Sequence, residues 1–283
     1  MSEPVISTVN ALILGIVEGI TEFLPVSSTG HLVITSDLLG LRNLANFSPD
    51  EIEAIQAFEI VIQGGAILAV LLVYRRYFID TIRGVLGKSP AGRRLFINIV
   101  TATVPVLGAG FLLKGVISRY LQFTTPVLAA LVLGGIAMLF FERIQSRKAP
   151  ESSAGLVVHD LTPRQALIIG AVQCLALWPG TSRSMVTIIG GMVVGLSRPA
   201  AAEFSFLIAF PALLAATAYK ALKSGDVLIT HVGSTALAVG FLTSTMFAGL
   251  AVRWLISYLN ARGLSVFGWY RLALATVIFF VVT

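Results

Sequence analysis

The sequence predicts an all-α integral membrane protein made of two inverted-topology repeats, each a re-entrant helical hairpin plus three transmembrane helices. Three observations predict it: an excess of apolar residues, a series of long uncharged stretches, and two similar regions broken by proline, glycine and serine. Of the 283 residues, 56% are hydrophobic and only 12% are charged. A soluble protein of this length cannot hide so much apolar surface from water, so lipid must be part of its solvent.

Uncharged stretches place the membrane-spanning helices, because a charge at the centre of a bilayer costs about 2.5 to 3.5 kcal/mol. A helix needs about 20 residues to cross, and the shorter stretches can extend past a flanking glutamate. Six stretches are expected to span, and the last of them carries Arg271 inside it. They are Ile60–Tyr74, Leu95–Leu113, Tyr120–Phe141, Phe204–Tyr219, Val227–Val252 and Gly263–Thr283.

Two further regions each hold a pair of apolar segments that are too short to cross. The first pair is broken within Pro25–Gly30 and the second within Pro179–Ser184, where proline, glycine and serine end one helix and allow another to begin. We expect each pair to form a re-entrant hairpin whose irregular tip lines a cavity. The segments are Pro4–Val17 with Phe23–Ser36, and Gln165–Ser182 with Ser184–Ser197.

The two broken regions resemble each other, which indicates a repeat. Gly15–Glu18 aligns with Gly170–Gln173, and Ser28 aligns with Ser182 after a one-residue gap. We expect a single polytopic membrane domain over residues 1–283, with repeat one over about 1–143 and repeat two over about 160–283. Three crossings per repeat would turn the second repeat upside down relative to the first.

Basic residues orient this layout, since cytoplasmic loops carry an excess of lysine and arginine. The net charge of +6 is therefore attributed to loops, and no nucleic-acid partner is expected. The side expected to be cytoplasmic carries Arg75, Arg76, Arg83, Lys88, Arg93, Arg94, Arg143, Arg147, Lys148, Arg164, Arg198, Arg253 and Arg262. The opposite side carries Arg42, Lys114, Arg119, Lys220 and Lys223.

Glu18 and Glu22 are four residues apart on a short helix, so their carboxylates share one face. Two buried like charges are unfavourable unless something positive lies between them. A divalent cation, Mg²⁺ or Ca²⁺, is the natural candidate, because such hard cations prefer oxygen ligands. The alternative is a structural pair in which one glutamate is protonated.

Both breaks are expected to present a helix N-terminus to an anion. Ser27 and Thr29 lie at the start of the helix after the first break, and Ser182 and Ser184 at the second. Arg183 lies between the two serines of the second break and suits phosphate oxygens, which a guanidinium binds bidentately. The simpler alternative is that the serines are ordinary N-caps and that Arg183 pairs with a glutamate.

Ser28 and His31 are three residues apart, a spacing that suits a nucleophile and its base. A histidine in a helix is more often a hydrogen-bonded core residue, but nearby carboxylates and an arginine favour a functional role. His31 as the nucleophile, with Ser28 only binding phosphate, remains the rival scheme. His159 and His231 are expected to be solvated loop residues.

Supporting roles are expected for Glu59, Gln63 and Glu203, which open two of the predicted spans. They would orient the hairpins or bind serine and threonine hydroxyls, while Gly64 and Gly65 allow close helix approach. Arg271 is expected to be a structural ion-pair partner. The combined site suits a substrate with a polyanionic head and a lipid tail, and hydrolysis of a lipid diphosphate fits it directly.

The stretch Glu18–His31, EGITEFLPVSSTGH, resembles the signature of the bacterial undecaprenyl-diphosphatase family associated with bacitracin resistance. Trp178–Ser184, WPGTSRS, resembles the second motif of that family, and similarity extends over Phe58–Val70 and Glu203–Pro211. The resemblance implies hydrolysis of undecaprenyl diphosphate to the monophosphate, which regenerates the carrier lipid for cell-wall peptidoglycan synthesis.

The same resemblance implies a divalent cation, a prenyl diphosphate substrate among membrane lipids, and a multi-pass protein of the bacterial plasma membrane. It implies an active site open to the outer face, and it is compatible with a homodimer. By this resemblance Glu18 and Glu22 serve the metal and catalysis, Ser28 and His31 the phosphoryl transfer, and Arg183 the phosphate.

Two other functions remain open at this point. An inverted-repeat secondary transporter or lipid flippase for an anionic substrate also uses broken helices, but it needs no nucleophile. A lipid phosphatase of the other kind, with a Ser-Gly-His-like motif, needs a second histidine after its Ser-Arg element. None follows Arg183 within the second hairpin.

Overall fold

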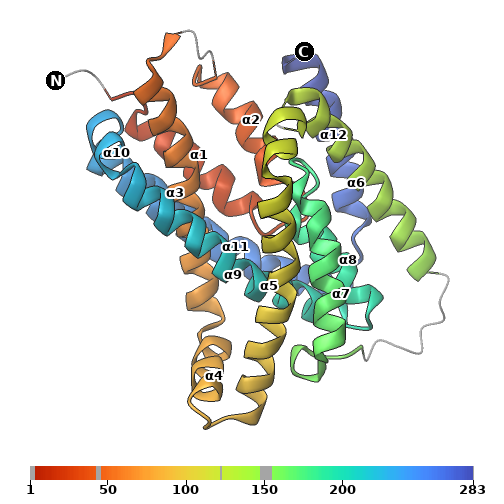
Figure 1. Ribbon diagram of the computed structural model, residues 1–283. Coiled ribbons are helices and arrows are strands. Elements are labelled where there is room, and N and C mark those ends of the chain that lie inside the picture. Colours follow the sequence, from red (N-terminus) through yellow and green to blue (C-terminus); the bar gives the residue numbers. More distant parts are fainter. Residues whose placement is uncertain (1–3, 43–45, 122, 147–154, 283) are drawn as a thin grey trace. The chain divides into compact units, whose positions relative to one another are not determined.

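The computed structural model describes residues 4–42, 46–121, 123–146 and 155–282, whose regular structure is helical apart from one isolated bridge between Leu156 and Leu196 (Figure 1). The chain forms two compact units. The first comprises Met1–Phe23, His31–Val73 and Ala209–Arg253, and the second comprises Leu24–Gly30, Tyr74–Ile208 and Trp254–Thr283. Each unit therefore combines residues from both ends of the sequence.

The first unit packs its helices around a core of aliphatic side chains and one phenylalanine. Leu14, Phe58 and Ile62 are completely buried in this core. The helices of this unit are α1 (Thr8–Thr21), α3 (Pro49–Val73), α10 (Gly225–His231) and the larger parts of α2 (Ser28–Leu38), α9 (Arg198–Lys223) and α11 (Ser234–Ala261).

Helix α1 lies against α11 at two glycines. A Cβ atom on Gly15 would lie 2.5 Å from the carbonyl oxygen of Gly240, and one on Gly19 would lie 2.5 Å from that of Ser244. Gly65 approaches the carbonyl oxygen of Phe241 in the same way. Close helix approach at small residues is how helices pack without a hydrophobic drive in lipid. The close approach expected at Gly65 is thereby confirmed.

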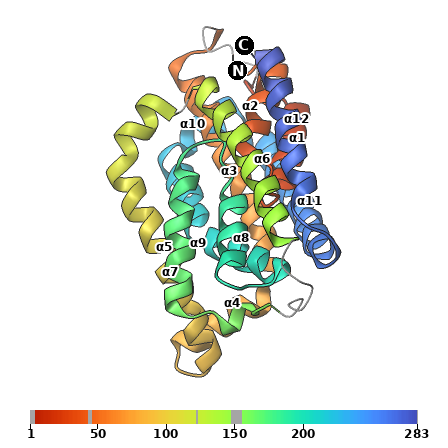
Figure 2. The ribbon, with the colours of Figure 1, turned by 90° about the vertical axis from the view of Figure 1, so that its right-hand side faces the viewer.

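The second unit contains the remaining helices. They are α4 (Arg75–Val85), α5 (Pro90–Val116), the π-helix η2 (Ile117–Leu121), α6 (Thr124–Gln145), the 3-10 helix η4 (Val158–Asp160), α7 (Pro163–Gln173), the 3-10 helix η5 (Cys174–Leu177), α8 (Arg183–Val193) and α12 (Ser265–Val282). Helices α6 and α12 lie side by side in both views (Figure 1 and Figure 2).

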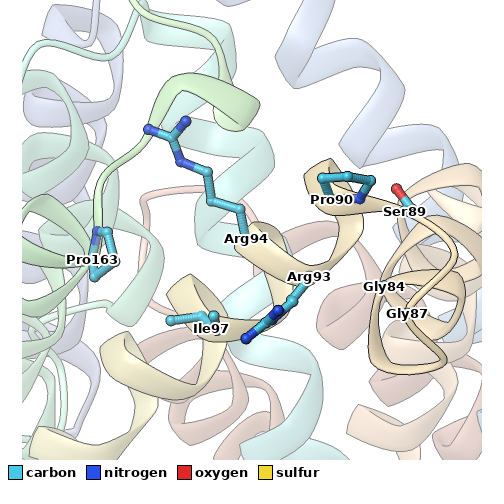
Figure 3. Close-up of a pocket in the computed structure, with 8 residues that line it drawn as sticks. All are labelled: Gly84, Gly87, Ser89, Pro90, Arg93, Arg94, Ile97 and Pro163. Carbon is cyan, nitrogen blue, oxygen red and sulfur yellow. The ribbon is translucent and has the colours of Figure 1, made fainter.

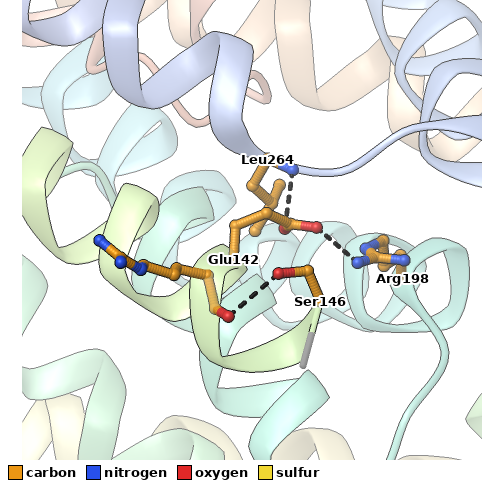
Figure 4. Close-up of polar contacts among 5 residues, drawn as sticks. Glu142, Ser146, Arg198 and Leu264 are labelled. Atoms are coloured by element: carbon orange, nitrogen blue, oxygen red, sulfur yellow. Dashed lines mark hydrogen bonds and ion pairs between the residues drawn. The ribbon is translucent and has the colours of Figure 1, made fainter. Parts of the chain in front are cut away.

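Glu142 ties three helices of this unit together near their ends (Figure 4). Its carboxylate pairs with Arg198 at the start of α9 and accepts the N–H of Leu264, just before α12, at 3.0 Å. A carboxylate bound by both a guanidinium and a backbone donor is held in a fixed orientation. Glu142 therefore fixes the end of α6 against the starts of α9 and α12.

Five helices in the described part of the chain are long and apolar enough to cross a membrane: α3, α5 with η2, α6, α9 and α11. The sixth expected span forms α12, which is helical but shorter. Each predicted hairpin forms a pair of short helices around a break, α1 with α2 and α7 with α8. The expectation of an all-helical integral membrane protein is confirmed.

Three boundaries differ from the expected ones. The span expected at 120–141 begins only at Thr124, because the π-helix carries α5 on to Leu121. The span expected at 227–252 is divided at Gly233, which has φ +82°, and α11 then continues past Arg253 to Ala261. The expected loop after Arg75 contains the helix α4. Arg147 and Lys148 lie outside the described residues.

Candidate active site

The first break lies between α1 and α2, within the signature stretch. Glu22 forms the C-cap of α1, and its N–H donates to the carbonyl oxygen of Glu18 at 2.9 Å. Helix α2 begins at Ser28, directly after Ser27, whose φ is 72°. The Ser27 hydroxyl oxygen accepts the N–H of Gly30 at 3.4 Å, as an N-cap residue does.

The second break has the same construction between α7 and α8. After η5 the chain turns at Gly180, with φ 92°, and at Ser182, with φ 73°. The Ser182 hydroxyl oxygen accepts the N–H of Met185 at 3.3 Å and so caps α8, whose first residue is Arg183. Each break therefore ends in a capped helix whose first N–H groups are directed toward the tip.

Ser27 and Ser182 are the non-glycine residues with positive φ in the described part of the chain. Because each of these serines caps the helix that follows it, Ser27 corresponds to Ser182, and Ser28 corresponds to Arg183. The expected alignment of Ser28 with Ser182 is therefore wrong by one residue. The second break has one more residue between its proline and its cap, which shifts the register. Such a backbone costs roughly 1–3 kcal/mol and persists only where the surroundings fix it, most often at functional sites.

Within the second unit the tips of the two breaks are in contact. The buried Ser184 hydroxyl donates to the carbonyl oxygen of Leu24 at 2.8 Å. The hydroxyl oxygens of Ser182 and Ser184 are 3.0 Å apart, and because the Ser184 proton is already used, Ser182 donates in this pair. Both hydroxyl protons are thus engaged within the protein. In this arrangement the second tip offers an anion its backbone N–H groups and Arg183.

Arg183 is the first residue of α8, and α9 holds its side chain. Its Nη1 donates to the carbonyl oxygen of Ser205 at 3.1 Å. The Ser205 hydroxyl lies 2.6 Å from that of Thr187, which donates back to the Arg183 carbonyl oxygen at 2.7 Å. These bonds fix the orientation of a half-buried guanidinium beside the second tip.

Arg271 on α12 holds the second tip from inside the unit. It is fully buried and donates to the carbonyl oxygens of Ala130, Leu131 and Gly180 at 2.9, 3.3 and 2.9 Å. No carboxylate among the described residues pairs with it, so the expected ion pair is wrong. The sequence indicates a structural role for Arg271 because this arginine lies inside a predicted span, where a charged side chain needs buried polar partners.

The two carboxylates of the signature belong to the first unit. Glu18 and Glu22 are one turn apart, and their side chains are 0% and 8% exposed. The close contact of α1 with α11 at Gly19 fixes the helix that carries them. Two buried carboxylates on one helical face favour a positive species beside them, as the sequence predicts.

These carboxylates are the oxygen ligands that Mg²⁺ and Ca²⁺ prefer. Among the described residues there is no group of three or more histidine, cysteine, aspartate or glutamate side chains suited to an ion. The chemistry of the two carboxylates suits such a cation, and a cation at Glu18 and Glu22 stays a prediction.

Ser28 and His31 both lie in the first turns of α2, one turn apart, as their spacing predicts. The candidate residues then fall into two groups. Glu18, Glu22, His31, Glu59 and Gln63 belong to the first unit. The second unit contains Ser27, Ser28, Thr29, Ser182, Arg183, Ser184 and Glu203. The chain itself joins the groups, because the first tip runs directly between Glu22 and His31.

Glu59 binds a serine hydroxyl, as the sequence predicts for this residue. Ser36 on α2 donates to Glu59 Oε1 on α3 at 2.9 Å. The bond ties the second helix of the first pair to the long helix that follows it, which is a supporting role. Gln63 lies one turn further along α3.

Glu203 instead binds a tyrosine. The Tyr77 hydroxyl donates to Glu203 Oε2 at 3.1 Å, and burial together with that carboxylate raises the pKa of Tyr77 well above its usual range, so the phenol stays protonated. His159 is exposed, as the sequence predicts, and its ring also stacks on Tyr77 with 5.2 Å between ring centroids. Sequence reasoning missed this pairing because more than 80 residues separate His159 from Tyr77.

The fold and the site define the class of protein. Several helices are suited to crossing a membrane, and they carry two broken helix pairs with strained serine caps, buried carboxylates and fixed arginines. Polar groups of this kind inside membrane helices mark the pathways and sites of integral membrane proteins that act on charged substrates.

The family model described as Bacitracin resistance protein BacA matches residues 11–277, and the chain belongs to this family. Its relatives include proteins named undecaprenyl-diphosphatase. That of Sorangium cellulosum is 43% identical over 95% of this chain and 84% of its own length. Those of Methylococcus capsulatus and Pseudomonas syringae pv. tomato are both 44% identical over 95% of this chain, covering 93% and 91% of their own lengths.

Proposed function

We propose that the protein hydrolyses undecaprenyl diphosphate to undecaprenyl phosphate and inorganic phosphate. The observation that carries this proposal is the similarity to undecaprenyl-diphosphatases over 95% of the chain, within a family match that includes both broken regions. Turnover would recycle the lipid carrier of peptidoglycan synthesis and confer bacitracin resistance. The chemistry of the site suits a diphosphate head on a long apolar tail.

In the proposed reaction the Ser28 hydroxyl attacks the terminal phosphorus. A bond from phosphorus to the serine oxygen forms as the bridging bond breaks, and undecaprenyl phosphate leaves. His31, one turn further along α2, takes the serine proton. The proton passes from His31 to the departing undecaprenyl phosphate, which leaves the imidazole neutral. His31 then takes a proton from a water molecule that attacks the phosphoserine, and it returns this proton to the Ser28 oxygen as the bond from serine to phosphorus breaks and inorganic phosphate leaves. The rival scheme makes His31 the nucleophile.

Charge stabilisation is assigned to the groups around the tips. Arg183, held by Ser205, would bind the phosphoryl oxygens together with the N–H groups that begin α2 and α8. Ser27, Thr29, Ser182 and Ser184 would shape this anion site. Glu18 and Glu22 would hold a divalent cation, Mg²⁺ or Ca²⁺, which when bound neutralises phosphate charge.

The proposed architecture is a pair of inverted repeats in the bacterial plasma membrane. Support comes from the matching caps at Ser27 and Ser182, and from the order of one broken pair followed by long helices in each half. The excess of basic residues near α4 and the start of α5 supports a cytoplasmic location for that side. The site would then open toward the outer face, and a homodimer is compatible with this layout.

A secondary transporter or flippase is the other candidate from a different class. The names of the relatives do not favour it. A carrier also has no use for a serine and a histidine one turn apart on a helix, in the same signature stretch as two glutamates.

Purified protein in detergent, supplied with prenyl diphosphates of several chain lengths, tests the proposal. Phosphate release is expected with undecaprenyl diphosphate, and a chelator should suppress it until a divalent cation is restored. The Arg183→Ala variant is the negative control. No phosphate release from well-folded wild-type protein, with or without cations, would contradict the hydrolase function.

A further inference from the structure

Helices α8 and α9 run antiparallel in the second unit, and a pair of buried hydroxyl groups joins them. A Cβ atom on Gly191 would lie 2.8 Å from the Cβ atom of Ala201, so the two helices are close there. The hydroxyl oxygens of Thr187 and Ser205 are 2.6 Å apart, and these residues are 1% and 0% exposed. Because Thr187 precedes Gly191 by one turn and Ser205 follows Ala201 by one turn, the hydroxyl pair is the next contact toward the second tip.

The hydrogen atoms of this pair can be placed from their partners. Each hydroxyl carries a single proton. Thr187 lies one turn after Arg183, and its Oγ1 is 2.7 Å from the Arg183 carbonyl oxygen and 3.2 Å from that of Ser184. Carbonyl oxygens only accept, so the threonine proton is directed to them, and Ser205 donates its own proton to Thr187. Neither hydroxyl therefore has a proton left for a substrate.

Arg183 closes this set of bonds into a ring. Its Nη1 donates to the carbonyl oxygen of Ser205 at 3.1 Å, while the Ser205 hydroxyl leads back through Thr187 to the Arg183 carbonyl oxygen. A long arginine side chain has many rotamers, but its guanidinium is planar, so a bond at one nitrogen restricts the plane in which the others lie. The ring thus ties the guanidinium to the first turn of α8, whose N–H groups face the same tip.

We propose that Ser205 and Thr187 are positioning residues for phosphate binding, and that they act through Arg183. This role rests on the proposed function, in which Arg183 binds the phosphoryl oxygens of a diphosphate. The substrate touches neither hydroxyl, because both are buried and both protons are used within the ring. Without the ring, binding has to order the guanidinium at the cost of affinity, and a misplaced donor stabilises the transition state less.

Phosphate release by the full chain in detergent tests this role, with Thr187→Val as the first variant. Valine has the branched shape of threonine but no hydroxyl, so kcat/KM should fall about tenfold, as for one lost hydrogen bond. Thr187→Ser keeps the hydroxyl and should stay within about twofold of the wild type. Thr103→Val is the matched control, because Thr103 is also buried and donates to a carbonyl oxygen one turn earlier, that of Ile99 at 2.8 Å. Its kcat/KM should stay within about twofold as well.

A double-mutant cycle with Arg183→Lys separates positioning from a general loss of structure. Where lysine replaces the guanidinium, the ring has nothing left to orient, so Thr187→Val should cost less than about twofold there. A merely structural role would lower kcat/KM by the same factor in both backgrounds. Ser205→Ala keeps the backbone carbonyl that Arg183 binds and should repeat this pattern, and it decides the question if Thr187→Val does not fold. Equal losses in both backgrounds, a loss in Thr103→Val as large as in Thr187→Val, or no recovery in Thr187→Ser would overturn the proposal.

Binding of inorganic pyrophosphate, measured by titration calorimetry, gives a readout that does not depend on turnover. Its Kd should rise about tenfold in Thr187→Val, but less than about twofold when the same change is made in Arg183→Lys. A pocket of about 370 Å³ at the α4–α5 turn also exposes an arginine, Arg93, to small anions, and none of its lining residues belongs to α8 or α9 (Figure 3). Arg93→Gln should therefore leave the Kd unchanged.

The two readouts distinguish the positioning role from the hydrolase function. Pyrophosphate binding that depends on Thr187, without any phosphate release from the lipid, would contradict the hydrolase function and leave the positioning role in place. Phosphate release at the wild-type rate by both Thr187→Val and Ser205→Ala would overturn the positioning role alone. That role would also be overturned by wild-type protein that binds no pyrophosphate, or by binding that is lost in Arg93→Gln, which would place the anion in the pocket.

Discussion

Ser184 donates its hydroxyl proton to the carbonyl oxygen of Leu24 at 2.8 Å, and this bond joins the two helix breaks across 160 residues of sequence. Ser184→Ala leaves a buried carbonyl without this donor, which costs roughly 1–3 kcal/mol. We expect a lower thermal unfolding midpoint in detergent and a slower release of phosphate. Ser118→Ala removes an exposed serine bond to Gly115 and should change neither quantity, whereas equal effects in both variants would argue against the tip contact.

Gly134 provides the space for the buried guanidinium of Arg271. A Cβ atom there would lie 2.3 Å from Arg271 Nη2, so Gly134→Ala must displace the group that holds the Gly180 carbonyl. We expect a loss of about 1–3 kcal/mol in unfolding free energy, the usual range for overpacking, and reduced turnover. Gly108→Ala is the control, because nothing lies within 4 Å of its added methyl group, and it should be neutral or slightly stabilising. A Gly134→Ala protein as stable as Gly108→Ala would contradict this packing.

Arg183→Lys keeps the charge but loses the planar fork. A lysine cannot hold the Ser205 carbonyl oxygen and a phosphate group in the same fixed geometry. Phosphate release should fall by about 10² to 10³, the cost of one charge-assisted contact in the transition state. Near-normal activity of Arg183→Ala would place the phosphate elsewhere.

Ser28 and His31 can be distinguished as nucleophiles by the phosphoenzyme that each would form. If serine attacks, Ser28→Ala should be nearly inactive, and phosphoenzyme trapped from the wild-type protein should survive acid, as phosphoserine does. His31→Gln should then slow both its formation and its breakdown, because the proposed base is lost. An acid-labile phosphoenzyme that persists in Ser28→Ala would assign the attack to His31.

Glu18 and Glu22 are the proposed cation ligands. Glu22→Gln removes one of two buried carboxylates, so turnover should be abolished or should need a much higher concentration of divalent cation. Glu51→Gln changes an exposed carboxylate on α3 and is the control. Metal titrations that are unchanged in both Glu18→Gln and Glu22→Gln would remove these residues as ligands.

Much of this fold can be predicted from hydropathy and from the residues that break helices. Proline, glycine and serine at Pro25–Gly30 and Pro179–Ser184 predict two broken helix pairs, and uncharged stretches predict the long helices. Helix α4 was not predicted, because the arginines and the aspartate among its apolar residues give it the low hydropathy of a basic loop. Its 3.6-residue period is visible only when Ile79, Ile82 and Leu86 are compared.

One support of the candidate site can be predicted from residue types, whereas another depends on tertiary packing. Glu59 was expected to bind a hydroxyl, and the side chain of Ser36 supplies it. The role of Arg271 depends on carbonyl oxygens from α6 and from the second tip, which only tertiary packing brings together. The predicted correspondence of the two caps was wrong by one residue. It was based on an alignment of prolines, which does not show which residue has the positive φ that precedes each helix.

The contact of α1 with α11 at Gly15 and Gly19 has a consequence for biogenesis. Helix α1 is made well before α11 and completes its packing only after α11 has been synthesised. Until then the face of α1 that covers α11 in the finished protein has no partner, and such late, non-local pairing is slow and exposed to misassembly. Chains that terminate before Ser234 should therefore be degraded early, because α1 would enter the membrane without the helix against which Gly15 and Gly19 pack.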